Sequence, residues 1–408
     1  MKKGILLCTA LLLISIIGYG QEGVFIDQNI EQFINDFQAT NNGSGIIVGV
    51  VDNGKTTYYK LGTTSKKSNN VLSESSIFEL GSVSKVFTTA ALVNMSDNQE
   101  LFLNNKIDGY LPKYIIAPRY KNIICTTIEV QLPQGEKWLP AVTSCRPDPF
   151  TPEKFVAICD LASHSSGLHN PTVSNKSFHP FHSSDFIKNP KLSFTKDDIL
   201  STIDNYLLDC PPGIEFNFSD LGYGVLGIIM SDIAGMEYDH LIAHKLSEKL
   251  GLKNTAVWLS TAQRDQVAAG YNHKGKEVKP MLQDAMAPAY GLRSSAEDLV
   301  TMLKANLGPA ETPLEVGLVE AHHPRIFFET SEKVYGIGLG WFISAAEGNE
   351  ETKLIWQNGQ TAGYASFIGF SKDLQKGIVV LSNSSKDVTP LGMKILEYLA
   401  SKKMTIRP

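Results

Sequence analysis

The segment from Phe78 to Phe87 (FELGSVSKVF) constrains this chain more than any other. It places the hydroxyl of Ser82 three residues before the amine of Lys85, at the start of an apolar, helix-forming run. Residues three apart in a helix lie on one face, so we expect the two side chains to project together. Ser82 then sits at the positive end of the helix dipole, which favours an alkoxide there. The segment predicts a nucleophile with a neighbouring base.

The residues that follow predict how this helix packs. Apolar side chains recur at helical spacing and form one stripe, made of Val86, Ala90, Leu92, Val93 and Met95. We expect this stripe to dock the helix into the core.

A serine three residues before a lysine is a weak signal when it stands alone. The chain holds a second copy, Ser193 and Lys196, where Thr195 is typical of an ordinary helix cap. Ser82 could likewise be a cap beside a solvated lysine. Two further segments favour the catalytic interpretation: 212–223, which contains Phe218, and 356–364, which contains Gln357.

With Ser82 and Lys85, these segments resemble in order the three motifs of the serine β-lactamase and penicillin-binding-protein superfamily, specifically its class C β-lactamase and D-alanyl-D-alanine carboxypeptidase branch. The resemblance covers nearly the whole chain after residue 20. It implies an α/β (α+β) fold, an antiparallel sheet flanked by helices with an inserted, mainly helical region. It also implies a serine hydrolase that acts through an acyl-enzyme on a β-lactam or a D-alanyl peptide amide bond.

The resemblance implies that Ser82 is the acylated residue and that Lys85 assists proton transfer. Phe218 stands where the family has a tyrosine, and Asp220 where it has an asparagine. Phenylalanine has no hydroxyl, so a step that needs one must use Lys85, a water molecule or a neighbour such as Ser219. Asp220 can accept hydrogen bonds from Lys85, and its charge favours the ammonium form of that lysine.

Three residues take the place of the family's third motif, Lys-Thr-Gly or His-x-Gly: Gln357, Asn358 and Gly359. Gln357 lacks the positive charge that relatives present to a substrate carboxylate, and Arg293 is the next candidate to supply it. Gly359 allows close backbone approach, and we expect the N–H groups of Ser82 and Gln360 to form the oxyanion hole. Thr361 matches a family position beside the substrate.

Three functions remain open after these departures. The first is a β-lactamase or carboxypeptidase, the second an esterase or amidase of the same fold that depends less on a carboxylate, and the third a weakened or non-catalytic cell-wall-binding protein. The intact pair of Ser82 and Lys85 favours catalysis, whereas Phe218 and Gln357 favour attenuation. No cofactor is expected. The spacings of His179 with His182 and of His240 with His244 do not predict a metal site, because no glutamate or third ligand accompanies them.

Residues 1–20 have the basic start, apolar core and small-residue end of a secretory signal, so we expect a secreted or periplasmic protein. Residues 21–408 are then one β-lactamase-like domain, with its α/β part at about 21–95 and 290–408 and its helical part at about 96–289. No later apolar stretch reaches about 18 residues, so no membrane span is expected. The net charge of −5, without a basic cluster, argues against a nucleic-acid partner. The substrate is a small molecule or a peptidoglycan peptide, and the oligomeric state stays open.

An insertion at about 113–157 departs from the family's short link. It is either a lid over the site or a surface hairpin tied by a disulfide. Four cysteines follow the signal segment, Cys125, Cys145, Cys159 and Cys210, and they permit three connectivities. We favour Cys125 with Cys145, which both belong to the insertion. The run at 161–168 resembles a family turn in which the counterpart of His164 has a structural role.

Periodicity predicts a hairpin with strands at 45–51 and 56–61. Helices are expected at 199–208, 223–233, 238–250, 391–400 and from a cap at 294–297 through Leu303. Further strands are expected at 338–343, 353–357, 366–370 and 377–382.

Overall fold

The computed structural model describes residues 27–402, apart from 131–138, 171, 174–175, 178–192, 282–284, 309–314 and 331–332. The expected signal segment at 1–20 and the pair of His179 and His182 lie outside the described residues. Within the described part of the chain, no helix combines the length and the apolar character needed to cross a bilayer.

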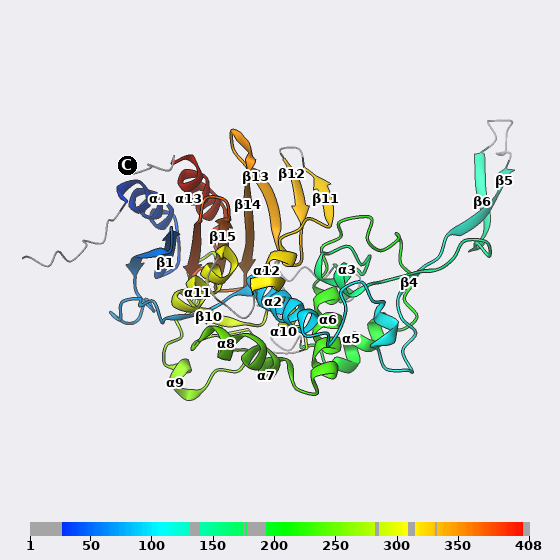
Figure 1. Cartoon of the computed structure of the whole chain (residues 1–408), viewed down its shortest axis with the longest axis horizontal. Helices are drawn as coiled ribbons and strands as arrows, with labels where there is room; N and C mark the ends of the chain where they lie inside the picture. Colours follow the sequence, from blue (N-terminus) through cyan, green and yellow to red (C-terminus); the bar gives the residue numbers. More distant parts are fainter. Residues whose placement is uncertain are drawn as a thin grey trace, which may run out of the picture.

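An eight-stranded antiparallel sheet forms the centre of the fold (Figure 1). From one edge to the other its strands are β11 (Ile326–Glu329), β12 (Val334–Ile337), β13 (Phe342–Ala346), β14 (Asn349–Gln360), β15 (Ala365–Ser371), β16 (Lys376–Ser382), β1 (Gly45–Asp52) and β2 (Lys55–Gly62). Because β1 pairs with β16, segments from both ends of the sequence share one sheet. The predicted fold class is confirmed.

The first hairpin forms as predicted. Asp52 pairs with Lys55, so a two-residue turn of Asn53 and Gly54 joins β1 to β2. Both turn residues have positive φ, 49° and 79°, which suits the asparagine and glycine found there.

One predicted strand is wrong. Residues 338–341 lie in the turn between β12 and β13 rather than in a strand at 338–343. Gly340 has φ +77°, and a Cβ at Gly338 would lie 2.2 Å from the carbonyl oxygen of Ala321. These two glycines allow the chain to turn close to its neighbours, and the apolar run across them obscured the turn.

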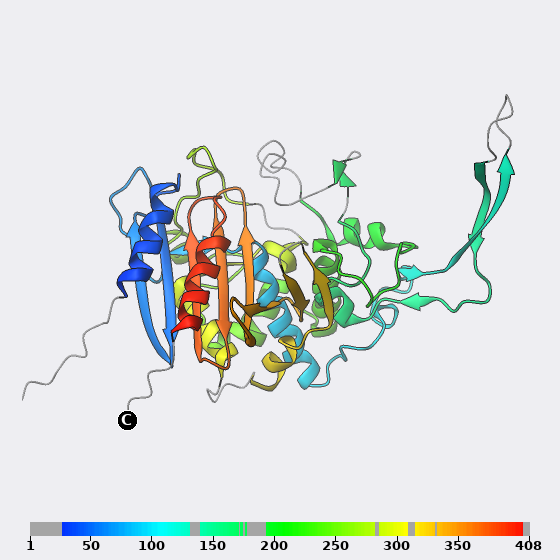
Figure 2. The same cartoon turned by 90° about the horizontal axis from the view of Figure 1, so that it is seen from above.

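The two faces of the sheet carry different helices. Ile46 and Val48 pack with α1 (Gln28–Ala39) and α13 (Thr389–Ser401), which lie together on one face (Figure 2). Ile47 belongs to the other core, where α11 (Ala296–Leu307) contacts the sheet. This division follows from the alternation of side chains along a strand.

Helix α2 (Ser84–Asp97) carries the expected nucleophile region and is buried all round. Every residue from Ser84 to Met95 is buried, so the prediction of a single apolar stripe is wrong. Polar positions in α2 are hydrogen-bonded inside the protein: Thr88 donates to the carbonyl oxygen of Pro288 at 2.6 Å, and Thr89 to that of Lys85 at 3.1 Å. A helix enclosed in this way holds its side chains in fixed positions.

The middle of the chain is mainly helical, as expected. It contains α3 (Ile158–Ala162), α5 (Lys196–Ile203), α6 (Asp220–Ala234), α7 (Tyr238–Ile242), a π-helical turn (Ala243–Ser247), α8 (Glu248–Leu250), α9 (Thr261–Arg264) and α10 (Ala287–Tyr290); α12 (Glu315–Ala321) follows α11. Short strands pair β3 (Ile77–Glu79) with β10 (Arg293–Ser295), β4 (Arg119–Tyr120) with β7 (Lys154–Phe155), and β8 (Thr172–Val173) with β9 (Lys176–Ser177), and a 3₁₀ turn spans Ile107–Gly109.

Several helix boundaries differ from the prediction: α11 continues to Leu307, and α13 begins at Thr389 and ends at Ser401. Helix α5 starts after the predicted cap Thr195 but ends at Ile203, because Asp204 is extended and Asn205 has φ +54°. Helix α6 begins at Asp220, three residues earlier than expected, since Ser219 caps it. Ser295 caps α11 as predicted, and the run at 238–250 is helical as predicted, with the π-helical turn inside it.

The insertion forms a hairpin of β5 (Ile123–Val130) and β6 (Leu139–Pro147). Both views show it extending away from the body of the molecule (Figures 1 and 2). This arrangement agrees with the surface-hairpin alternative and not with a lid.

Cys125 lies directly opposite Cys145 in the hairpin, while Cys159 and Cys210 are free thiols. The facing register suits a cross-strand disulfide, which stays a prediction.

For a chain lacking residues 1–20, we expect Ellman titration of the denatured, unreduced protein to find two thiols, and four after reduction. Burial raises the pKa of Cys159 to about 11, so it should react slowly in the native state. Four thiols before reduction would show that the bridge is absent.

Candidate active site

Ser82 lies in a 3₁₀ turn (Gly81–Val83) that leads directly into α2, so the predicted helix start is confirmed in this tighter form. Gly81 has φ +53°, and a Cβ there would lie 2.6 Å from the backbone nitrogen of Gln360. Glycine is therefore required for the turn to approach the end of β14. The Ser82 side chain is held at the base of α2 and is 3% exposed.

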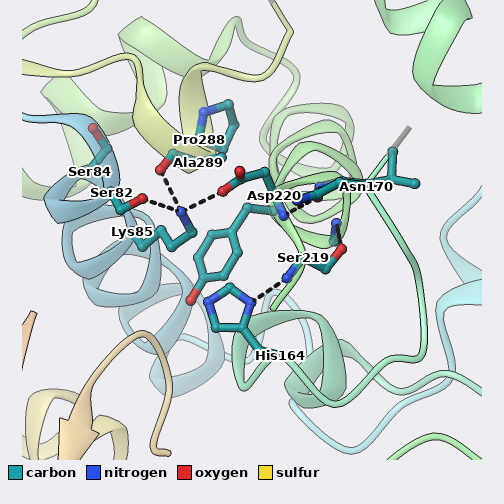
Figure 3. A network of polar contacts seen from close by, with 12 residues as sticks. Ser82, Ser84, Lys85, His164, Asn170, Ser219, Asp220, Pro288 and Ala289 are labelled. Carbon is teal, nitrogen blue, oxygen red and sulfur yellow. Dashed lines mark hydrogen bonds and ion pairs between the residues drawn. The ribbon is translucent and has the colours of Figure 1, made fainter. Parts of the chain in front are cut away.

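Lys85 connects Ser82 to the helical region (Figure 3). Its Nζ donates to Ser82 Oγ at 2.9 Å, to Asp220 Oδ1 at 2.7 Å and to the carbonyl oxygen of Ala289 at 3.0 Å. Three acceptors satisfy the three protons of an ammonium group. After loss of one proton, the amine can keep its bonds to Asp220 and Ala289 and accept the proton of Ser82. The geometry therefore permits proton exchange between Ser82 and Lys85.

The charges of this network are fully buried, since Lys85 and Asp220 are both 0% exposed. Burial lowers the pKa of the Lys85 amine, and attraction to Asp220 opposes part of that shift. The lysine is thus easier to deprotonate than one in water, while Asp220 limits the change. Asp220 controls how readily Lys85 can act as a base.

Asp220 is fixed by the start of α6. Ser219 Oγ accepts the N–H of Gly222 at 2.9 Å, and Asn170 Oδ1 accepts the N–H of Asp220 at 2.6 Å. The N–H of Ser219 donates to Nδ1 of His164 at 3.1 Å. Burial lowers the pKa of His164 well below its usual range, so this ring is a neutral acceptor. The geometry fits the structural role expected for His164.

Phe218 lies between His164 and Lys85. Its ring stacks on His164 with centroids 4.5 Å apart, and Lys85 Nζ lies 4.8 Å from its centroid. The nearby Tyr223 does not replace the missing hydroxyl. Its OH donates to the carbonyl oxygen of Ala162 at 2.6 Å, and burial raises its pKa well above the usual range.

The end of β14 closes the other side of the site. A Cβ at Gly359 would lie 2.0 Å from the carbonyl oxygen of Leu80 and 2.9 Å from the nitrogen of Ser82. The strand and the Ser82 turn are therefore in direct backbone contact. Gln357 is 2% exposed, and its Nε2 donates to the carbonyl oxygen of Gly340 at 2.8 Å.

A pocket of about 210 Å³ opens above the nucleophile, lined by Ser82, Phe218, Phe342, Gln357, Asn358, Gln360 and Asp387. A larger cavity of about 780 Å³ includes Trp258 and Asp239 in its lining but not Ser82. We place the site at the smaller pocket, because this pocket contains the nucleophile. The greater volume of the other cavity does not by itself identify a site.

Of the residues predicted to contact the substrate, Gly359, Thr361 and Arg293 are not among those that line this pocket. Thr361 is buried, and its Oγ accepts the N–H of Gly363 at 3.4 Å. Arg293 donates to the carbonyl oxygens of Val257 at 2.8 Å and Met281 at 3.0 Å. Arg293 also lies 3.6 Å from a carboxylate oxygen of Glu79. Neither Thr361 nor Arg293 lines the pocket as a group ready to bind a substrate carboxylate.

The structure also adds residues that the sequence did not indicate. Ala289 contributes only a carbonyl oxygen, so its side-chain type carried no signal. The Asn170 side chain accepts the N–H of Asp220, a contact between segments that are distant in the sequence. Phe342 lies in β13 and Asp387 in the loop that follows β16, and in the sheet these two strands lie on opposite sides of β14. His240 and His244 are exposed on the helical surface, and among the described residues no group of three or more potential ligands is placed to hold a metal.

Comparison with known proteins places this geometry in a family. The family model described as "Beta-lactamase" matches residues 30–400. A β-lactamase from Pseudomonas fluorescens is 22% identical over 390 residues, covering 88% of this chain and 94% of the relative. A β-lactamase/D-alanine carboxypeptidase structure from Pseudomonas syringae superposes with a TM-score of 0.72 at 20% identity, covering 94% of this chain and 99% of that one. A class C β-lactamase from Rhodobacter sphaeroides gives a TM-score of 0.70 at 19% identity, covering 92% and 99%. The fold, the order of the motifs and the matched family together show that the chain belongs to the β-lactamase family.

Proposed function

We propose that this protein is an exported serine hydrolase that forms an acyl-enzyme on Ser82. The observation that carries the proposal is the contact of Lys85 Nζ with both Ser82 Oγ, at 2.9 Å, and Asp220 Oδ1, at 2.7 Å, beside a pocket that Ser82 lines. A serine held against a buried amine has a proton acceptor already in place. Export rests on the signal-like residues 1–20.

Acylation follows from the arrangement of these groups. Ser82 Oγ attacks the substrate carbonyl carbon as its proton passes to the neutral amine of Lys85. The carbonyl π bond opens, and its oxygen becomes an oxyanion held by the N–H groups of Ser82 and Gln360. The anion collapses, the bond to the leaving group breaks, and the Lys85 ammonium returns its proton to that group, directly or through water. Phe218 has no hydroxyl with which to share this transfer.

Hydrolysis completes the cycle by the same groups. A water molecule attacks the acyl ester and gives its proton to Lys85. The second tetrahedral intermediate then expels Ser82 Oγ, which recovers the proton. Since one lysine serves each step, its pKa sets the pH dependence of both half-reactions.

The family favours a β-lactam or a D-alanyl peptide amide as substrate. A second candidate, an ester or amide without a carboxylate, is favoured by the pocket: among the described residues that line it there is no Lys, Arg or His. A carboxylate bound there would lack a charge-assisted hydrogen bond from the wall.

A panel of three reagents separates these functions: a fluorescent penicillin, a D-Ala-D-Ala peptide and a p-nitrophenyl ester. Penicillin labelling or release of D-alanine supports the family's substrates. Ester hydrolysis alone supports the second candidate. If folded protein reacts with none of the three, the hydrolase proposal is wrong and a binding role is favoured.

Phe218→Tyr restores the hydroxyl that the family carries at this position. A positioned proton carrier contributes about 10² to 10⁴-fold, but an unpaired hydroxyl beside His164 costs about 1 to 3 kcal/mol. We therefore expect a gain of severalfold in kcat on the best substrate. Steady-state rates of Phe218→Tyr and Lys85→Ala across pH test this. A Phe218→Tyr protein no faster than wild type, beside an inactive Lys85→Ala, would mean that Lys85 moves the protons alone.

A further inference from the structure

The wall of the Ser82 pocket includes a carboxylate. Asp387, in the loop between β16 and α13, lines the pocket together with Asn358. Asp387 Oδ1 accepts the N–H of Thr389 at 2.8 Å and its hydroxyl proton at 2.6 Å. The side chain of Asp387 is thereby fixed against the first residue of α13.

The hydrogen bonds of Thr389 fix the orientation of Asn358. Asn358 Nδ2 lies 2.9 Å from Thr389 Oγ1. Because the single hydroxyl proton of Thr389 is given to Asp387, Thr389 must accept from Asn358. One N–H of the Asn358 amide is used in this bond, which leaves the carbonyl oxygen and the second N–H for a ligand. Asn358 and Asp387 then both offer oxygen acceptors.

Two described lysines near the pocket, Lys85 and Lys386, are both engaged elsewhere. Lys85 is paired with Asp220 below the pocket, at 2.7 Å. Lys386, next to Asp387 in sequence, turns the other way: its Nζ contacts Thr40 and lies 4.5 Å from the ring centroid of Phe37. Among the described lining residues, Asp387 carries the one formal charge.

The remaining walls are aromatic. Phe218 and Phe342 line the pocket. Phe342 belongs to a larger aromatic cluster, in which Phe216 stacks on Phe328 at 4.3 Å and lies 6.3 Å from Phe342. Aromatic rings beside a carboxylate favour an alkylammonium group, which has apolar surface and a positive charge, over a carboxylate. The wall chemistry is opposite to that of a carboxylate-binding site.

We infer that Asp387 is a specificity-determining residue and that the preferred substrates carry a cationic, alkylammonium-type group near the scissile carbonyl rather than a carboxylate. This inference rests on the proposed acylation of Ser82. Asp387 attracts the cation, the Asn358 carbonyl oxygen accepts from an N–H where one is present, and the aromatic rings contact its apolar surface. The inference goes further than the loss of charge at Gln357, which by itself predicts only indifference to a carboxylate.

Two matched series of esters test the inference. In the first, p-nitrophenyl esters have acyl chains that end in trimethylammonium, tert-butyl or carboxylate. In the second, phenyl acetates carry the same groups on the leaving phenol, with rates corrected for alkaline hydrolysis. We expect the cation to exceed the carboxylate by about tenfold in kcat/KM at low salt in at least one series, and the ratio to shrink as salt rises.

Asp387→Asn should bring this ratio to within about twofold, while Asp373→Asn, which removes the same charge from an exposed turn, should leave it unchanged. If Asp387→Asn does not fold, the salt dependence in wild type is the deciding measurement. A carboxylate preference, no preference in either series, or a cation preference that survives in folded Asp387→Asn would overturn the inference. Failure to hydrolyse any of these esters would instead count against the proposed esterase activity.

Discussion

Gly359→Ala is expected to lower kcat/KM by about a hundredfold or more. The added Cβ would lie 2.0 Å from the carbonyl oxygen of Leu80, a backbone atom that cannot rotate away. The end of β14 must then move away from the Ser82 turn, and the N–H of Gln360 moves with it. Loss of one oxyanion donor costs about 10² to 10³ in kcat, which sets the expected size of the effect.

Gly109→Ala is the matched control, because a Cβ at Gly109 would meet nothing within 4 Å. Both variants should be assayed well below their melting temperatures, with circular dichroism to establish folding. Overpacking at Gly359 costs typically about 1 to 3 kcal/mol of stability, so a lower Tm is also expected. A folded Gly359→Ala protein that keeps kcat/KM within about fivefold of wild type would show that this backbone contact does not support catalysis.

Asp220→Asn is expected to move the acidic limb of the kcat/KM profile to lower pH. Lys85 must be neutral to accept the proton of Ser82, so activity rises as pH passes upward through the lysine pKa. Asparagine removes the charge that opposes desolvation, and the pKa of Lys85 falls further. Partners of opposite charge shift a pKa by about 1 to 3 pH units, so the limb should move by that amount.

Stability provides an independent readout of the same change. In Asp220→Asn, Lys85 binds its proton more tightly in the unfolded chain than in the folded chain. Lowering the pH therefore favours the unfolded chain, and the free energy of unfolding should fall. The matched control is Asp298→Asn, at a buried aspartate that accepts from Asn254 and Thr255 rather than from Lys85. Asp298→Asn should leave the position of the acidic limb unchanged. An acidic limb in Asp220→Asn that stays in place, or moves to higher pH, would contradict the role of Lys85 as base.

The parts of the site that lie close together in sequence were predictable. Ser82 and Lys85 meet because one helical turn separates them, and this spacing is visible in any sequence. Asp220 and Gln357 are distant from them, and only the resemblance to a family indicated that they would meet. Asp387 lies in a loop with no local pattern that marks a pocket, so its position required the sheet order to be known.

The fold was predictable where periodicity and turn residues agreed. The hairpin around Asn53 satisfied both. Helix α1 was not predicted, although Ile30, Phe33, Ile34 and Phe37 repeat at helical spacing and pack against the sheet. Helix α5 ended early because the side chain of Asp204 accepts the N–H of Ile116 at 2.8 Å, a contact between distant segments. Long-range hydrogen bonds of this kind override local propensity and leave no mark in the sequence nearby.

Acylation of Ser82 is the central claim, and intact-mass spectrometry of the protein after brief incubation with a penicillin and an activated ester tests it most directly. We predict a mass increase equal to one acyl group, mapped to the peptide that contains Ser82 and absent from Ser82→Ala. Ser193→Ala, which alters the second serine that precedes a lysine by three residues, should acylate like wild type. An adduct that persists in Ser82→Ala, or folded wild-type protein that forms no adduct with either reagent and hydrolyses neither, would contradict the claim.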